Sequence, residues 1–228
     1  MVTLHHLEDS RSQRILWMLE ELGCDYEIVY YERDPKTNLA PESLREIHPL
    51  GKAPVVTDGE RTLAESATIL EYLARSYGKG RWAPDLDDAS YWDFNYWMHY
   101  AEGSLMPPLL LKLVFSKLRE PPVPFFIRPL TSKVADQVDA AFTDRQIETH
   151  FGYVDGFLSE NQWFAGDRIT AADVQMSFPL EAAMAGGRVT RADYPYIAVW
   201  LEKIHARPAY RRALEAGGDY AYGPASEE

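Results

Sequence analysis

Residues 48–66 of this 228-residue chain read HPLGKAPVVTDGERTLAES, and this stretch decides how the first part of the chain folds. Two short apolar runs lie in it, Val55-Val56 and Leu63-Ala64. Asp58-Gly59 between them is typical of a tight hairpin turn, in which both turn positions need positive φ. The stretch therefore predicts a β-hairpin.

The hairpin runs directly into the start of a helix. Glu65 and Ser66 precede an apolar-periodic segment that contains Ile69, Leu70 and Leu73. The first turn of a helix has free backbone N–H groups and the positive end of the helix dipole, so it favours a carboxylate. We therefore expect an anion to bind beside Ser66.

Pro54 is the other unusual residue of this stretch. Proline cannot donate to a β-ladder, so it belongs at the first residue of a strand, at an edge or in a bulge. An ordinary trans bond at a strand start accounts for it. If the Ala53-Pro54 bond is cis, the backbone of Ala53 is turned outward and can pair with a peptide-like ligand as an added strand would.

The residues before this stretch predict a strand, a helix and a second strand. Residues 2–6 are a strand candidate, residues 15–22 place their apolar side chains on one helical face, and Gly23 ends that helix. Residues 25–31 are β-branched and aromatic, and a short helix begins at Pro41. The first eighty residues therefore predict the order β-α-β-α-β-β-α, a compact α/β layer structure.

The rest of the chain predicts an all-helical domain. Residues 78–84 are turn-rich and predict a linker between a domain of residues 1–80 and a helical domain of residues 88–216, with 217–228 as a mobile tail. The expected helices span about 90–118, kinked at Pro107-Pro108, and about 130–158, and three shorter ones follow Thr170, Pro195 and Pro208. Thr170-Ala-Ala-Asp173 follows the capping-box pattern, with Ile169 and Val174 as its hydrophobic staple.

Composition excludes several classes of function. A net charge of −12 argues against a nucleic-acid surface, which needs a basic stripe. No run of 18 apolar residues and no basic-then-apolar leader occurs, so we expect a cytoplasmic protein with no membrane partner. One cysteine, Cys24, cannot form an internal disulfide, and six scattered histidines show no metal-ligand spacing, so we expect no metal.

Four motifs in order resemble the cytosolic glutathione transferases over nearly the whole chain. They are HPLGKAP, LAES, the linker that separates the two halves and the Thr-x-x-Asp box. The segments LHHLEDSRSQRILWMLEELGCDYE and NYWMHYAEGSLMPPLLLK look most like the bacterial and yeast-type members. The resemblance implies a thioredoxin-like first domain, glutathione as co-substrate, detoxification-type conjugation of a hydrophobic electrophile, and a homodimer.

The resemblance also assigns glutathione-binding residues. Ala53, before the family's cis proline at Pro54, corresponds to the residue that pairs with the cysteinyl backbone. Glu65 and Ser66 match the pair that holds the γ-glutamyl end, with Ser66 for its carboxylate and Glu65 for its ammonium group. Lys52 fits the basic residue that meets the glycyl carboxylate. His48 either assists Lys52 or is only a turn residue beside Pro49.

Several residues compete for the catalytic position. Family members use a tyrosine, serine or cysteine near the start of the first helix, and Ser10 matches best when Arg14 is aligned with the arginine of the serine-type enzymes. Ser10-x-x-Gln13 also satisfies a capping box, which needs no catalytic role. Ser12, Arg11 and a backbone N–H stay as alternatives for the activation of the thiol.

The second substrate is expected between the domains, against an aromatic face of the long helix. Tyr96, Trp97 and Tyr100 are spaced to share one side, although such a stripe is also typical of a core. Two other functions stay open: a glutathione-dependent peroxidase or disulfide reductase, and a noncatalytic binding module of the same fold.

Overall fold

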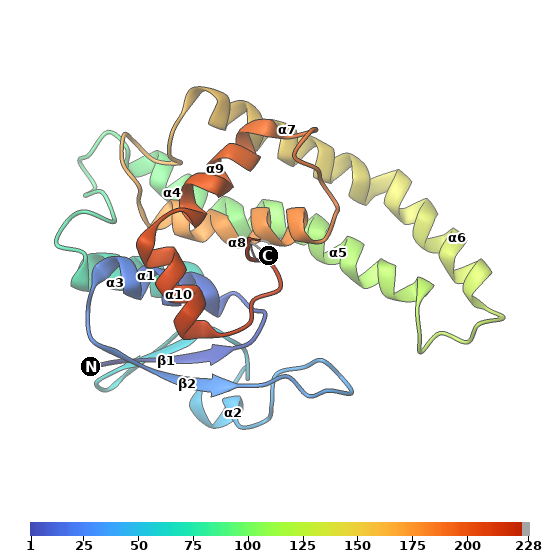
Figure 1. Cartoon of the computed structure of the whole chain (residues 1–228), viewed down its shortest axis with the longest axis horizontal. Coiled ribbons are helices and arrows are strands. Elements are labelled where there is room, and N and C mark those ends of the chain that lie inside the picture. Colours follow the sequence, from blue (N-terminus) through green and yellow to red (C-terminus); the bar gives the residue numbers. More distant parts are fainter. Residues whose placement is uncertain (225–228) are drawn as a thin grey trace.

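The computed structural model describes residues 1–224, and its first part is a four-stranded sheet with helices on its faces (Figure 1). The strands, in the spatial order β2-β1-β3-β4, are β1 (Val2–Leu7), β2 (Tyr26–Tyr31), β3 (Val55–Asp58) and β4 (Arg61–Ala64). β1 pairs with β2 in parallel and with β3 antiparallel, and β3 pairs antiparallel with β4.

Three helices complete this part: α1 (Ser12–Leu22), α2 (Leu44–Ile47) and α3 (Ser66–Tyr77). α1 buries its apolar face, and Gly23 ends it at φ 61°, where its N–H donates to Leu19 O at 3.0 Å. A residue with a side chain is strained at that φ, so glycine suits the position. The predicted order β-α-β-α-β-β-α is confirmed.

The hairpin turn differs by one residue from the sequence prediction. Asp58 pairs with Arg61 across the hairpin, so the two turn residues are Gly59 and Glu60. Of these two only Gly59 has positive φ, at 58°. The predicted pair Asp58-Gly59 is therefore wrong in register, and Asp58 belongs to the strand. Its carboxylate accepts a hydrogen bond from Tyr72 at 2.9 Å and another from Tyr77.

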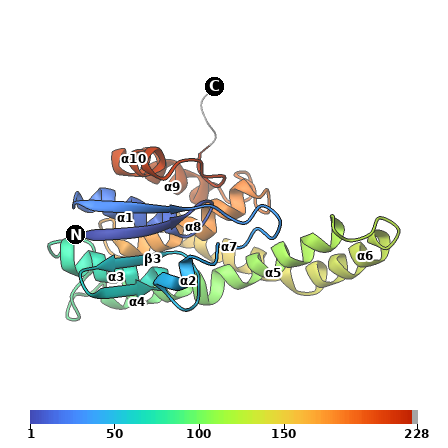
Figure 2. The same ribbon diagram turned by 90° about the horizontal axis from the view of Figure 1, so that it is seen from below.

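The second part is all-helical, as predicted. Its α-helices are α4 (Tyr91–Tyr100), α5 (Met106–Ser116), α6 (Arg128–Val138), α7 (Asp144–Glu160), α8 (Ala171–Ala185), α9 (Pro195–His205) and α10 (Pro208–Gly217). The α4–α5 and α6–α7 pairs form two long rods, and the α5 and α6 ends of these rods project away from the rest of the molecule (Figures 1 and 2).

Each long rod contains a short irregular segment. Ala101–Leu105 is a π-helical turn between α4 and α5, and Asp139–Thr143 is another between α6 and α7. Pro107 and Pro108 follow the first of these, and neither can donate the N–H that a regular helix would need. The irregularity of the first rod therefore lies one turn before the prolines and not at them.

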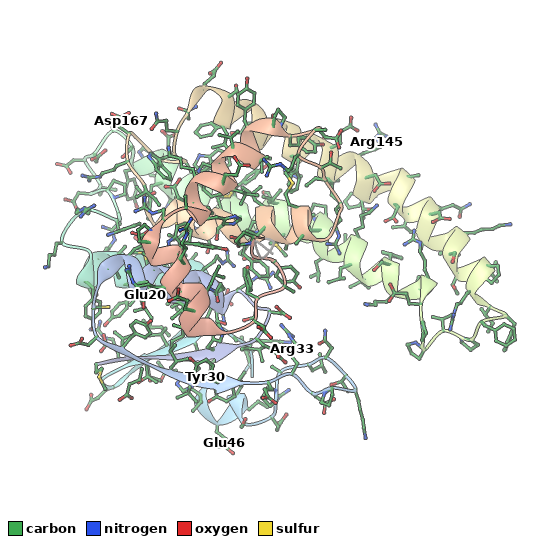
Figure 3. The ribbon with its side chains drawn as sticks, viewed as in Figure 1. Glu20, Tyr30, Arg33, Glu46, Arg145 and Asp167 are labelled. Atoms are coloured by element: carbon green, nitrogen blue, oxygen red, sulfur yellow. The ribbon has the colours of Figure 1, made fainter. Side chains whose placement is uncertain are left out.

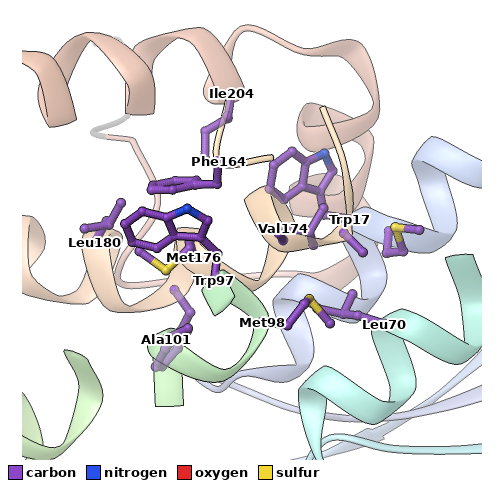
Figure 4. Close-up of a cluster of buried hydrophobic side chains, with 14 of the residues drawn as sticks. Trp17, Leu70, Trp97, Met98, Ala101, Phe164, Val174, Met176, Leu180 and Ile204 are labelled. Atoms are coloured by element: carbon purple, nitrogen blue, oxygen red, sulfur yellow. The ribbon is translucent and has the colours of Figure 1, made fainter. Parts of the chain in front are cut away.

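The core joins the two parts of the chain (Figure 4). Trp17 and Leu70 come from the first part, and they share one buried cluster with Met98, Val174 and Phe164 from the second. α10 packs on α1. Glu20, labelled in Figure 3, lies at this contact and accepts a hydrogen bond from Arg212 at 2.6 Å. The two parts therefore form one continuous hydrophobic core.

The capping box at α8 is confirmed. Thr170 is extended, its side chain accepts from the N–H of Ala172, and Asp173 accepts from the N–H of Thr170 at 2.8 Å. Asp173 also accepts from the N–H of Phe164 at 2.9 Å, so it fixes the preceding loop as well.

The expected mobile tail is wrong for residues 218–224. Tyr220 donates to Glu181 at 3.0 Å, and the ring of Tyr222 lies edge-on to Phe178 at 5.6 Å. The N–H of Ala221 donates to Asp9 at 2.7 Å. Two tyrosine rings of this segment therefore pack on α8 and hold the segment against the protein. The small and polar residues around these tyrosines gave no indication of this packing. Residues 225–228 of the expected tail lie outside the described residues.

Candidate functional site

The strand register brings the predicted glutathione residues to one edge of the sheet. His5, near the end of β1, pairs with Val55 at the start of β3, and Val55 pairs with Ala64 at the end of β4. Pro54 precedes β3, and Glu65 follows β4. The loop that carries Ser10 follows β1, so all three segments meet at the same edge.

The Ala53-Pro54 peptide bond is cis, which is the alternative that a ligand-pairing role requires. Pro54 is buried and Ala53 is partly exposed. Lys52 beside them is exposed, and no acidic side chain among residues 1–224 pairs with it. An exposed cation thus lies next to a partly exposed backbone segment.

The turn that leads to Lys52 depends on a glycine. Gly51 has φ +56°, and a Cβ there would approach the side chain of Arg45 to 2.7 Å. Glycine is the residue that adopts this conformation without steric cost. His48 is partly buried, and its Nδ1 accepts from the N–H of Leu50 at 3.4 Å. In this arrangement His48 serves the turn beside Pro49.

Glu65 and Ser66 form the start of α3, as predicted. Glu65 has φ 69° and ψ 118°, a conformation that residues with a side chain rarely adopt and that clusters at functional sites. Its side chain is exposed, whereas Ser66 is buried. An exposed carboxylate thus lies next to the free N–H groups of a twelve-residue helix.

Ser10 lies in a buried network of hydroxyl groups. Its Oγ donates to Leu7 O at 2.8 Å, accepts from the N–H of Ser12 at 3.2 Å, and lies 2.7 Å from Ser12 Oγ. Ser12 Oγ lies 3.0 Å from His6 Nδ1, and burial lowers the pKa of His6, so that this imidazole is neutral at pH 7. The hydroxyl of Ser10 is thereby held at the end of β1.

The predicted capping box Ser10-x-x-Gln13 does not form. α1 begins at Ser12 with Arg11 as its N-cap, and no side chain caps it. Gln13 Nε2 is buried, and it finds no hydrogen-bond partner in the part of the chain that the structure describes. Ser10 instead makes a local turn with the N–H of Ser12, a common alternative for serine.

A charged cluster that the sequence reasoning missed connects this edge to the helical part. Arg14 is 1% exposed. Its guanidinium donates to Gln175 O at 2.6 Å, to Ser66 Oγ at 3.3 Å and to Glu102 at 2.5 Å. Arg11 donates to both oxygens of Glu102, at 2.9 and 3.0 Å. Arg14 and Glu102 are 88 residues apart, and no local pattern links them.

Electrostatics follow from this geometry. Burial raises the pKa of Glu102, but the guanidinium groups of Arg14 and Arg11 outweigh that effect and hold the pKa below its ordinary value. Both guanidinium groups also stack over the ring of Phe178, each 5.3 Å from its centroid. The buried guanidinium group of Arg14, which these contacts hold in place, donates to Ser66 Oγ and so fixes the Ser66 side chain.

The aromatic residues expected in a second-substrate pocket do not face the sheet. Trp97 is 1% exposed and packs against Phe157 and Phe164, so its place is in the core of the helical part. The hydroxyl oxygen of Tyr100 lies 2.6 Å from His150 Nδ1 on α7, and the ring of Tyr96 stacks on that of Tyr100. This prediction is therefore wrong for Trp97, and it misplaces the aromatic stripe, which faces α7. Met98, one position along, points toward Leu70 in the first part (Figure 4).

Comparison with known proteins identifies the family of this chain. The glutathione S-transferase N-terminal domain model matches residues 1–75, and the C-terminal domain model matches residues 108–208. Glutathione S-transferase 1 of Saccharomyces cerevisiae is 35% identical over 94% of this chain and 94% of its own length. Glutathione S-transferase 3 of Schizosaccharomyces pombe is 38% identical over 94% of this chain and 87% of its own. The chain belongs to the cytosolic glutathione S-transferase superfamily. It is an enzyme of the transferase class.

Solved glutathione S-transferases have the same architecture. One from Actinobacillus pleuropneumoniae is 33% identical, with a TM-score of 0.79 over 98% of this chain and 100% of its own. A sphingomonad glutathione S-transferase in complex with glutathione is 22% identical, with a TM-score of 0.74 over 95% of this chain and 98% of its own, and supports the fold alone. The expected resemblance to bacterial and yeast members is confirmed. In the described part of this glutathione S-transferase, no helix could cross a membrane.

Proposed function

We propose that this glutathione S-transferase binds glutathione where β1 and β4 end and β3 begins, and joins the glutathione sulfur to a hydrophobic electrophile. The observation that carries the proposal is the meeting of three distant segments at one edge of the sheet: the Ser10 loop, Ala53-Pro54 and Glu65-Ser66. Each segment contributes a different kind of contact for a tripeptide with two carboxylates and one ammonium group.

The ligand groups follow from these contacts. Ala53 pairs through its backbone with the cysteinyl part, and Pro54 holds that backbone in place. The start of α3 and the hydroxyl of Ser66 receive the γ-glutamyl carboxylate, and Glu65 receives the ammonium group. Lys52 receives the glycyl carboxylate, with His48 beside it.

The chain has to lower the pKa of the glutathione thiol. A free thiol with a pKa of about 8.5 is only a few per cent ionised at neutral pH. A reduction of roughly two pKa units needs about 2.7 kcal/mol of selective stabilisation of the thiolate. A charge-assisted hydrogen bond contributes about 1.5–3 kcal/mol, so one positioned hydroxyl is of the right size.

Ser10 is the hydroxyl that we propose for this task. Its hydrogen points to Leu7 O or Ser12 Oγ, and a hydroxyl hydrogen rotates about its C–O bond to suit its partner. The N–H of Ser12 meanwhile holds the Ser10 oxygen in position. In the reaction the thiolate attacks the electrophilic carbon, a C–S bond forms, and the leaving group departs with the electron pair.

A cysteine-based reductase is less well supported by the geometry. Cys24 lies just before β2, and β2 runs parallel to β1 with Val2 opposite Tyr26. Cys24 is therefore at the opposite edge of the sheet from Ser10. Burial also raises the pKa of its thiol, which disfavours the reactive thiolate.

The proposed function is tested by glutathione conjugation to a halogenated dinitrobenzene. We expect saturable, glutathione-dependent turnover by the purified chain. Glutathione binding without turnover on a panel of such electrophiles would instead indicate a noncatalytic module. Absence of both binding and turnover would contradict the proposal.

Replacement of Glu65 by alanine is expected to weaken glutathione binding by roughly 2 kcal/mol or more, because the ammonium group loses its partner. Calorimetric titration measures the affinity. Glu60→Ala is the matched control, since Glu60 is an exposed acid in the turn at the other end of β4. Equal affinities of the two variants would remove Glu65 from the site.

We also expect a two-fold symmetric homodimer, because closed two-fold dimers are the commonest assemblies of soluble proteins and the family resemblance implies one. Sedimentation velocity at micromolar concentration is the measurement. A single species with the mass of one 26.0 kDa chain would overturn this expectation.

A further inference from the structure

The far end of the projecting rods carries exposed apolar side chains. α5 and α6, with the segment between them, extend away from the body as a hairpin (Figures 1 and 2). At its end Phe125 is 78% exposed, Phe126 is 70% exposed and Leu130 is 66% exposed. Single exposed apolar residues are ordinary on a protein surface, but a cluster with two phenylalanines marks an interaction site. We call residues 117–133 the tip.

The tip has a defined structure that keeps its aromatic side chains outward. Arg128 Nε donates to Val123 O at 2.7 Å, and Thr131 Oγ1 donates to Leu118 O at 2.7 Å, so the segment is closed on itself. Four prolines restrict its backbone: Pro121, Pro122, Pro124 and Pro129. The exposure of the two phenylalanines is therefore built into the loop.

The charge of the tip is opposite to that of the rest of the chain. The tip has four basic residues and one acidic residue, a formal charge of +3 in a chain of −12, so the remainder carries −15. Lys117 pairs with Glu120, and Arg119 pairs with Asp136 and Asp139. Arg128 and Lys133 have no acidic partner among residues 1–224. Two cations of the tip thus have no carboxylate partner in the part of the chain that the structure describes.

We propose that the tip binds the surface of an anionic lipid bilayer, with Phe125 and Phe126 in the interfacial region and Arg128 and Lys133 at the lipid phosphates. Aromatic and aliphatic side chains flanked by lysine and arginine are the pattern of interfacial membrane contact. This mode of binding requires no spanning helix, and none is present among the described residues.

The length of the hairpin separates the tip from the acidic body of the chain. The eleven residues of α5 extend about 16 Å, which exceeds the Debye length of about 8 Å at physiological salt. The acidic body is therefore screened from the lipid charge when the tip makes contact.

Vesicle co-sedimentation of the full chain tests the proposal. The probes are vesicles of phosphatidylcholine alone and vesicles that also contain phosphatidylserine. We expect binding to the second kind, a loss of more than about tenfold in Phe125→Ser/Phe126→Ser, and a loss of about fivefold in Lys133→Gln, which removes one exposed charge. The control is Trp92→Ser, because Trp92 is a 71% exposed aromatic residue on α4, outside the tip. It should bind as the unaltered chain does.

Three results would overturn the proposal. The first is no binding of the unaltered chain to anionic vesicles, and the second is equal losses in the tip variants and in Trp92→Ser. The third is a dimer that dissociates in Phe125→Ser/Phe126→Ser, which would show that the tip contacts a second copy. Thermal melting and conjugation activity close to those of the unaltered chain establish that the tip variants are folded.

Discussion

Replacement of Arg14 by methionine is expected to lower the free energy of unfolding by about 3–5 kcal/mol, the range measured when one partner of a buried ion pair is removed. The substitution keeps the side-chain length but leaves Gln175 O and Ser66 Oγ without their donor. Glu102 then keeps only Arg11, which is more exposed. Urea unfolding followed by tryptophan fluorescence gives the change, and glutathione affinity should fall with it because Ser66 loses its support.

An exposed arginine pair provides the control for Arg14. Arg75 donates to Glu71 at 2.8 Å, and their side chains are 39% and 44% exposed. Arg75→Met should therefore cost less than about 0.5 kcal/mol. Equal effects of Arg14→Met and Arg75→Met would show that the buried cluster contributes no more than a surface pair. Arg14→Met/Glu102→Gln should be less destabilised than the sum of the single variants.

The pH dependence of stability gives a second readout of the same cluster. The folded-state pKa of Glu102 is held below its ordinary value of 4.5, so its contribution is complete above that pH. The contribution is lost as the pH falls through the lower, folded-state pKa. We expect the urea midpoint to fall as the solution is acidified below about pH 4.5, and Glu102→Gln to reduce that fall.

Replacement of Asp173 by alanine is expected to cost about 3 kcal/mol of stability, the second large effect. The substitution leaves the N–H groups of Phe164 and Thr170 buried without an acceptor, at about 1–3 kcal/mol each. Thr170→Ala removes only the N-cap side chain and should cost about 1 kcal/mol. The measurement is again the free energy of unfolding in urea.

Asp167 provides the control for Asp173, because it is an exposed acid in the same loop (Figure 3). Asp167→Ala should change stability by no more than about 0.5 kcal/mol. If Asp173→Ala were as mild as Asp167→Ala, the capping box would have no special part in fixing α8 and the loop before it.

Local sequence signals predicted most of the fold, because each acts over a few residues. Gly23 ends α1, and Thr170 with Asp173 starts α8, through contacts within one helical turn. The meeting of Pro54 and Glu65 at one edge also follows from the short hairpin between them. These elements needed no knowledge of the distant chain.

The features that the sequence did not predict are those that depend on distant partners. Glu102 meets Arg14 across 88 residues, and Tyr220 reaches Glu181 across 39. Trp97 has the spacing of a pocket residue and of a core residue alike, and only the position of α7 decides between them. A periodic pattern identifies a buried face without naming what covers it.

The most direct test of the account is a titration of the glutathione thiol bound to the enzyme, followed by the ultraviolet absorbance of the thiolate. With the unaltered chain we expect a pKa roughly two units below the free value of about 8.5. In Ser10→Ala the pKa should rise toward the free value, with glutathione affinity close to unaltered. The melting temperature should fall slightly, because the buried N–H of Ser12 loses its acceptor. Ser10→Asp, which keeps an acceptor for the Ser12 N–H but places a negative charge beside the sulfur, should raise it further. A bound thiol with the same lowered pKa in all three proteins, or a fully active Ser10→Asp enzyme, would contradict the assignment of Ser10 as the group that activates glutathione.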